Sequence, residues 1–168
     1  WIYLATVNQR LSAEYIDTGL KNASSHKYRV KAFTFDDVES APTKVLEAVT
    51  KPAPKGVSGV KASNNIPKKI FLAWNASPTN DVVQYEIHRS NYESFSYKKI
   101  GSVNANTLEY TDNVEDDGLK YYYKIIPIDK DGLDGSSDIT PAKGESLGKL
   151  PKPNLSQASV QSGVAVLS

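Results

Sequence analysis

Short runs of alternating hydrophobic and polar residues occupy the middle of this chain. Ile70, Leu72 and Trp74 take every second position of one run, and Tyr85 and Ile87 do so in the next. A period of two is that of a β-strand with one buried face. No segment has hydrophobic residues spaced by three and four between helix-capping residues, so helices should be nearly absent. The pattern predicts an all-β fold.

The chain also contains an internal repeat. The segment 15–17, Tyr-Ile-Asp, recurs as Tyr-Thr-Asp at 110–112, and the segment 28–32 recurs at 123–127, both at a spacing of 95 residues. About 100 residues make one β-sandwich domain. The repeat therefore predicts tandem modules of the same fold.

Two stretches rich in Pro and Lys mark the module boundaries. They lie at 50–54 and 149–153, and proline restricts the backbone and cannot continue a strand ladder. We expect residues 1–51 to be the C-terminal half of one module, 52–148 a complete module and 149–168 the N-terminal strands of a further one. Because the chain lacks Met, we interpret it as a fragment.

The composition narrows the function classes. Lys and Arg number 20 against 19 Asp and Glu, so no net field attracts nucleic acid or an anionic membrane. The absence of Cys removes disulfides, thiol catalysis and thiolate metal sites. No apolar run approaches the roughly 20 residues that span a bilayer. Stability must come from packing.

The aromatic residues of the complete module resemble the signature of a fibronectin type III domain. The resemblance rests on Trp74, Tyr85, Tyr110-Thr111-Asp112 and the segment 121–125, and it covers residues 52 to about 142. It implies seven strands in two sheets of a β-sandwich, with strand B at 70–74, strand C at 82–89 and strand F at 120–128.

Two further features follow from this resemblance. The tyrosine near the start of strand F corresponds to Tyr121, whose counterpart in the first repeat is His26. The F–G loop, residues 129–135, lacks the cell-attachment tripeptide of the family, so integrin binding by that route is not expected.

More narrowly, segments 98–103 and 121–125 are similar to fibronectin-like lipoproteins on the surface of Gram-negative mucosal bacteria. This resemblance implies an extracellular or cell-surface adhesin, anchored to the bacterial outer membrane, that binds a host matrix protein such as fibronectin. The alternatives are a structural spacer module of a multidomain secreted enzyme and a receptor ectodomain.

Catalysis, cofactors and metals are not expected. His26 and His88 are the two histidines and lie in different modules, so neither has an evident triad. Asp129, Asp131 and Asp134 follow part of a calcium-loop pattern, but the distal Glu of such loops is missing. We interpret the segment as a Gly-containing turn between strands F and G.

Protein partners are expected to bind surfaces rather than a catalytic centre. If Tyr121, Tyr123 and Ile125 point inward, the alternate residues of strand F and of its first repeat point outward. These candidate partner-binding residues are Tyr122, Lys124, Ile126, Ile128, Phe33 and Phe35. Two interpretations remain open, namely coverage by strand C′ or a neighbouring module, and a partner surface.

The sheets also provide edge strands, which can accept an extended segment of another protein. The sequence leaves open that residues 151–168 of one chain complete residues 1–51 of another, because a half-sandwich buries too little apolar surface to fold alone.

Overall fold

The computed structural model describes residues 1–168 except 9–13, 138, 153, 155–157, 162–163 and 168. The chain divides into two compact units, Trp1–Ala53 and Pro54–Ser168. The division falls inside the predicted connector at 50–54. The assignment of residues 1–51, 52–148 and 149–168 to three modules stays a prediction.

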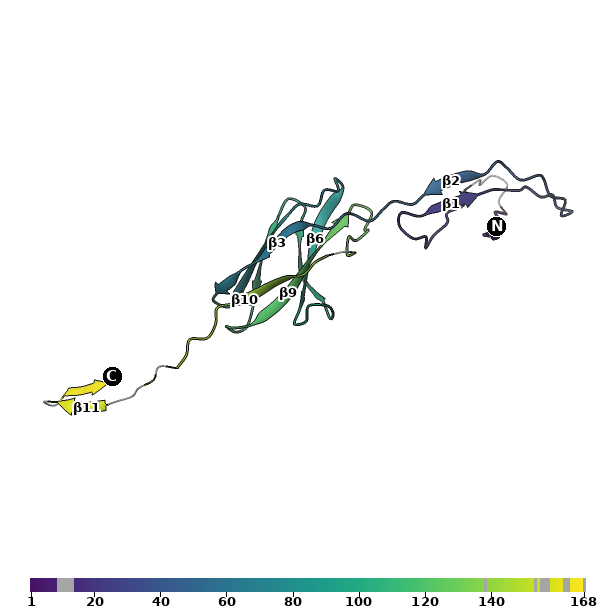
Figure 1. The fold of residues 1–168 in the computed structure, drawn as a ribbon. Helices are drawn as coiled ribbons and strands as arrows, with labels where there is room; N and C mark the ends of the chain where they lie inside the picture. Colours follow the sequence, from purple (N-terminus) through teal and green to yellow (C-terminus); the bar gives the residue numbers. More distant parts are fainter. Residues whose placement is uncertain (9–13, 138, 153, 155–157, 162–163, 168) are drawn as a thin grey trace. The chain divides into compact units, whose positions relative to one another are not determined.

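Two β-sheets form the sandwich of the C-terminal unit (Figure 1). The three-stranded sheet has the order β3 (Ser58–Ala62), β5 (Lys69–Asn75) and β8 (Glu109–Asn113). The five-stranded sheet has the order β4 (Asn64–Ile66), β10 (Ala142–Ser146), β9 (Lys120–Asp129), β6 (Val82–Ser90) and β7 (Lys98–Asn104). All neighbours pair antiparallel apart from β4 and β10, which run parallel.

This strand order is that of a fibronectin type III sandwich. Strands A, B and E correspond to β3, β5 and β8, and strands G, F, C and C′ correspond to β10, β9, β6 and β7. The described residues contain no helix. Across this part of the chain, no helix has the length and apolar character that a membrane crossing requires. The predicted all-β fibronectin type III fold is confirmed.

The core lies between the two sheets and follows the period of two. In β5, Ile70, Leu72 and Trp74 are buried while Phe71 faces outward. From the opposite sheet, inward residues of β6 and β9 meet them, namely Tyr85, Ile87, Tyr123 and Ile125. The rings of Trp74 and Tyr85 meet edge to face with centroids 5.7 Å apart. The three strands predicted from alternation, 70–74, 82–89 and 120–128, are confirmed as β5, β6 and β9.

A proline lies in the middle of the five-stranded sheet without breaking a ladder. Pro127 of β9 is opposite Tyr85 of β6, and its carbonyl accepts a bond from the Gly135 amide at 2.9 Å. Because the nitrogen and carbonyl of a strand residue point the same way, the proline nitrogen faces the Gly135 side. Strand β10 pairs with β9 at positions 120–123, and beside Pro127 the pairing of β9 on this side is reduced to an isolated bridge between Ile128 and Asp134. The proline, which has no N–H to donate, thus lies where the ladder is already interrupted.

The N-terminal unit contains an antiparallel pair, β1 (Ser25–Tyr28) and β2 (Leu46–Val49). In the repeat, β1 corresponds to the start of β9. The residue at the position of buried Ile125 is Val30, which is 65% exposed. The N-terminal unit therefore has strands at the repeated positions, but the side chain at this position is exposed there and buried in the sandwich.

At the C-terminal end, β11 (Ala158–Gln161) pairs antiparallel with β12 (Val164–Leu167). The opening strands predicted for a further module fall partly on residues 153, 155–157, 162–163 and 168, which lie outside the described residues. Completion of residues 1–51 by the tail of another chain stays a prediction.

Candidate binding surface

The predicted outward residues of β9 lie together on the outer face of the five-stranded sheet. They are half-buried and alternate with buried neighbours. The register places Lys124 opposite His88 and Ile126 opposite Glu86, both on β6. This outer face consists of Tyr122, Lys124, Ile126 and Ile128 of β9, Glu86 and His88 of β6, Tyr97 just before β7 and Lys99 of β7.

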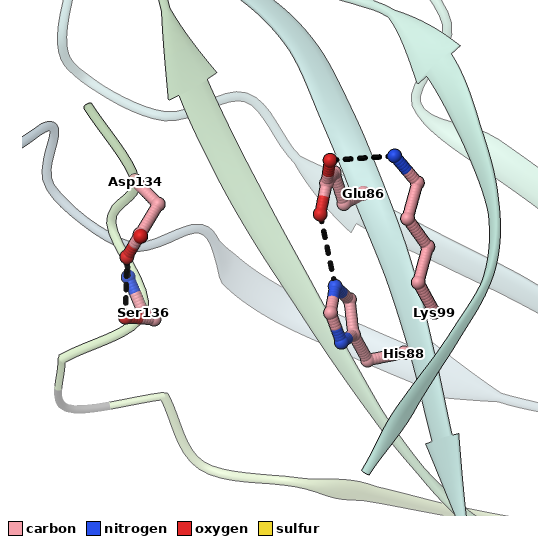
Figure 2. Close-up of polar contacts among 5 residues, drawn as sticks. All are labelled: Glu86, His88, Lys99, Asp134 and Ser136. Atoms are coloured by element: carbon pink, nitrogen blue, oxygen red, sulfur yellow. Dashed lines mark hydrogen bonds and ion pairs between the residues drawn. The ribbon is translucent and has the colours of Figure 1, made fainter. Parts of the chain in front are cut away.

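A charged network crosses this outer face. The Glu86 carboxylate accepts a bond from the Lys99 ammonium at 2.6 Å and contacts the His88 ring nitrogen Nε2 at 3.0 Å (Figure 2). The bond from Lys99, followed by that from His88, holds the pKa of Glu86 below its ordinary value. Lys99 belongs to edge strand β7, so a lysine of the edge strand provides the cation for Glu86 on the outer face.

Tyr97 covers a second part of the outer face. The Lys124 ammonium lies 4.6 Å from the centroid of the Tyr97 ring, which is the geometry of a cation–π contact. Burial raises the pKa of the Tyr97 phenol. Residues of the C′ strand region thus cover part of strand F, as one of the two interpretations expected. A partner-binding role for Tyr122, Lys124, Ile126 and Ile128 stays a prediction.

Phe33 and Phe35, the candidates in the N-terminal unit, are exposed. Phe33 retains 55% of its surface in solvent and forms an isolated bridge with Glu39. Phe35 lies at the turn of this segment and is fully exposed. Glu39 also pairs with the Lys31 ammonium, and that hydrogen bond lowers the pKa of Glu39. The two phenylalanines belong to a different unit from the outer face.

Tyr123, two residues after Tyr121, bonds from one sheet to the other. Its hydroxyl is bonded inside the sandwich to Asp112, while Tyr121 is half-buried with the Arg89 guanidinium 4.4 Å above its ring. The rings of Tyr121 and Tyr123 meet edge to face at 6.5 Å. In the N-terminal unit, His26 contacts the Ser24 hydroxyl at 2.7 Å.

The acidic F–G loop is held by backbone hydrogen bonds to one carboxylate. Asp129 accepts bonds from the amides of Asp131 at 3.0 Å and Leu133 at 2.8 Å, and Gly132 supplies a left-handed conformation with φ of 80°. These features are those of the predicted Gly-containing turn. Carboxylate oxygens of Asp81, Asp129 and Asp131 lie within 4.8 Å of one another, a proximity that the sequence did not indicate.

The loop between β6 and β7 contains an aromatic pair that sequence reasoning missed. Tyr92 and Phe95 are exposed, and their rings stack with centroids 4.5 Å apart. Their segment, 91–97, mixes aromatic residues with Asn, Ser and Glu and has no period of two. Aromatic residues outside a strand pattern are the signal that could have identified them.

Comparison with known proteins gives one informative sequence match. No family model matches the chain. A segment of 81 residues, 48% of the chain, is 38% identical to an amylopullulanase from Thermoanaerobacter thermohydrosulfuricus. The matched segment covers 5% of that protein, so the chain spans only a small fraction of this curated relative.

Several solved structures are similar to the chain at low identity. The fibronectin type III domain of the human collagen α-1(XX) chain is 18% identical, with a TM-score of 0.47 over 62% of this chain and 94% of that domain. Domains d3–d4 of the rat CD45 extracellular region are 15% identical, with a TM-score of 0.42 over 84% and 75% of the two chains. A β-1,2-glucanase from Parabacteroides distasonis is 20% identical, with a TM-score of 0.43 over 70% and 17%.

Proposed function

We propose that this chain is a non-catalytic part of a larger secreted, multidomain enzyme that acts on polysaccharides. The observation that supports this most is the 38% identity to a segment making up 5% of an amylopullulanase. Because the segment is so small a part of the relative, we infer that the catalytic residues of the relative lie in the rest of its sequence. The sandwich would act as a spacer that holds other domains in place.

The chemistry of the described residues supports a non-catalytic role. A hydrolytic triad needs a nucleophile, a base and a group that orients the base. His88 contacts Glu86, which could orient it as a base. The residue opposite His88 on β9 is Lys124, whose ammonium lies over the Tyr97 ring, so this position does not supply a nucleophile. His26 contacts Ser24, but the Ser24 hydroxyl donates its proton to the Lys21 carbonyl rather than to the His26 ring, so His26 does not act as a base toward it.

The native polypeptide tests this proposal directly. Antibodies against the 168-residue chain would isolate the polypeptide that contains it from a culture of the source organism. We expect a product far longer than the chain that hydrolyses a polysaccharide, while the 168-residue chain itself hydrolyses none. A native product built of sandwich modules with a membrane anchor, or hydrolysis by the chain alone, would contradict the proposal.

Adhesion at the cell surface to a host matrix protein is the second candidate. The exposure of Phe33 and Phe35 favours it, as does strand β7, which lies at the edge of the five-stranded sheet next to β6. Surface plasmon resonance against fibronectin would give a response that weakens in the double variant Phe33→Ala, Phe35→Ala. No response at tens of micromolar would exclude fibronectin as the partner. Isolation of a hydrolase in the antibody experiment would favour the spacer function instead.

A further inference from the structure

The loop between β6 and β7 presents two aromatic rings to solvent. Tyr92 is 54% exposed and Phe95 is 58% exposed. Their rings are 4.5 Å apart between centroids and nearly parallel, with 15° between the planes. Neither ring belongs to the core cluster between the sheets. The rings cover each other's inner faces, and their outer faces are the apolar surface that this loop offers to solvent.

Hydrogen bonds fix the geometry of this loop. Ser90 is 5% exposed, and its hydroxyl donates to the Phe95 carbonyl at 2.6 Å and accepts from the Tyr92 amide at 2.9 Å. One buried side chain thus holds the backbone at both aromatic residues. The Tyr97 hydroxyl also donates to the Glu93 carbonyl at 2.6 Å. A loop held in this way loses little conformational entropy when it binds a ligand.

The polar residues around the rings favour a neutral ligand. Residues 91–96 are all exposed, and Glu93 is the single charged residue among them. This loop therefore offers no cluster of cations to bind phosphates or an anionic surface. Asn91, Ser94 and Ser96 are exposed neighbours of the two aromatic residues in the sequence and carry amide and hydroxyl groups. A ligand suited to this loop has a flat apolar face and a hydroxyl-rich rim.

We propose that Tyr92 and Phe95 form a stacking platform for a neutral polysaccharide chain. A pyranose ring has apolar C–H faces, which can lie against an aromatic plane, and hydroxyl groups at its edge, which can bond to Asn and Ser side chains. This inference rests on the proposed function, since it assigns the module a direct contact with the polymer that the larger enzyme acts on. The module would then hold the enzyme on its substrate as well as separate its domains.

Affinity electrophoresis of the 168-residue chain tests this proposal. The chain would migrate through native gels with and without dissolved pullulan or amylopectin. We expect the polymer to retard the wild-type chain. The affinity of the double variant Tyr92→Ala, Phe95→Ala for the polymer should be at least about tenfold lower. Tyr92→Phe keeps the ring and should remain retarded. Phe71→Ala removes another exposed ring, 37% exposed on β5, and serves as the matched control.

Each outcome decides the question. Retardation that persists in the double variant would place the binding elsewhere and overturn the proposal. Equal loss in Phe71→Ala would overturn it as well, because the effect would not be specific to this loop. Circular dichroism of the double variant should show wild-type melting, since both rings lie outside the core.

The remaining outcomes separate this proposal from the proposed function. If the polysaccharides did not retard the wild-type chain, the platform proposal would be overturned. The spacer function would be unaffected, because the antibody experiment tests it separately. If the double variant lost binding to fibronectin while the polysaccharides had no effect on the wild type, the loop would be a protein-binding site instead.

Discussion

Asp112 of β8 and Tyr123 of β9 are joined across the two sheets by a hydrogen bond of 2.8 Å in which the tyrosine hydroxyl donates. A guanidinium nitrogen of Arg89 on β6 contacts both oxygens of the same carboxylate, at 3.1 and 2.9 Å. In the N-terminal unit, the Tyr28 hydroxyl donates to Asp17 at 2.9 Å. The two pairs occupy equivalent positions of the 95-residue repeat. The repeat therefore preserves a hydrogen bond between tyrosine and aspartate as well as a hydrophobic pattern.

Replacing Asp112 should destabilise the sandwich. Asp112→Asn keeps the size of the side chain but leaves Arg89 without its counter-charge. Since the Asp112 side chain is 8% exposed and that of Arg89 29%, we expect the free energy of unfolding to fall by about 2 kcal/mol, below the range for a fully buried pair. Urea unfolding followed by near-ultraviolet circular dichroism measures this change.

Glu109→Gln, an exposed change in the same strand, is the control for Asp112→Asn. It should alter the free energy of unfolding by less than about 0.5 kcal/mol. Equal effects of the two substitutions would show that the Arg89 contact contributes nothing to stability.

The Tyr123 phenol should make stability fall at high pH. Burial, and then the bond to Asp112, raise the pKa of Tyr123 well above its ordinary value of about 10. Because the folded state keeps the phenol proton, its contribution to stability is complete below the unfolded pKa. It declines above about pH 10, by up to about 1.4 kcal/mol for each pH unit.

Urea unfolding between about pH 9 and 11 measures this decline. Tyr123→Phe should make it shallower, and the slope that remains should include Tyr97, whose pKa is also raised. The same slope in wild type and variant would rule out Tyr123 as its source.

Two glycines near β10 should respond differently to a methyl group. A Cβ at Gly144 would lie 2.5 Å from Cγ2 of Ile70 in the core, whereas nothing lies within 4 Å of a Cβ at Gly148. Gly144→Ala should therefore lower the free energy of unfolding by about 1–3 kcal/mol through overpacking. Gly148→Ala should leave it within about 0.5 kcal/mol. Thermal melts of the two variants make the comparison, and equal melting temperatures would contradict it.

Glu86 should titrate at a lower pH than an ordinary glutamate. Lys99 and His88 stabilise its charged form, so its contribution to stability is present above the unfolded pKa and is lost as the pH falls through the folded pKa. Ion pairs at a partly exposed sheet face contribute little, so Glu86→Gln should cost about 0.5 kcal/mol at neutral pH.

Carboxyl carbon shifts in a nuclear magnetic resonance titration would give the Glu86 pKa. Lys99→Gln should move it back toward the ordinary value, because the Lys99 bond is the largest cause of the shift. A Glu86 pKa that does not respond to Lys99→Gln would show that the ion pair is not maintained in solution.

Much of the sandwich could be predicted because strand alternation is local. Leu72 and Trp74 lie on one face of β5 whatever the rest of the chain does, and both are buried. The outward set on β9 was predicted in the same way. The contact between Glu86 and Lys99 was not, because it depends on how β6 and β7 align. Their register shifts between Ile87 and His88, and the shift places Lys99 opposite His88.

The period of two, the repeat and the inward residues of the main strands follow from the order of residues alone, because each depends on neighbouring positions or on the likeness of two segments of the chain. Which polar groups meet depends instead on how the strands pack in three dimensions. Arg89, Asp112 and Tyr123 lie on three different strands, and the packing of two sheets brings them to one point. The stack of Tyr92 on Phe95 likewise depends on a loop conformation that the buried Ser90 hydroxyl fixes from inside.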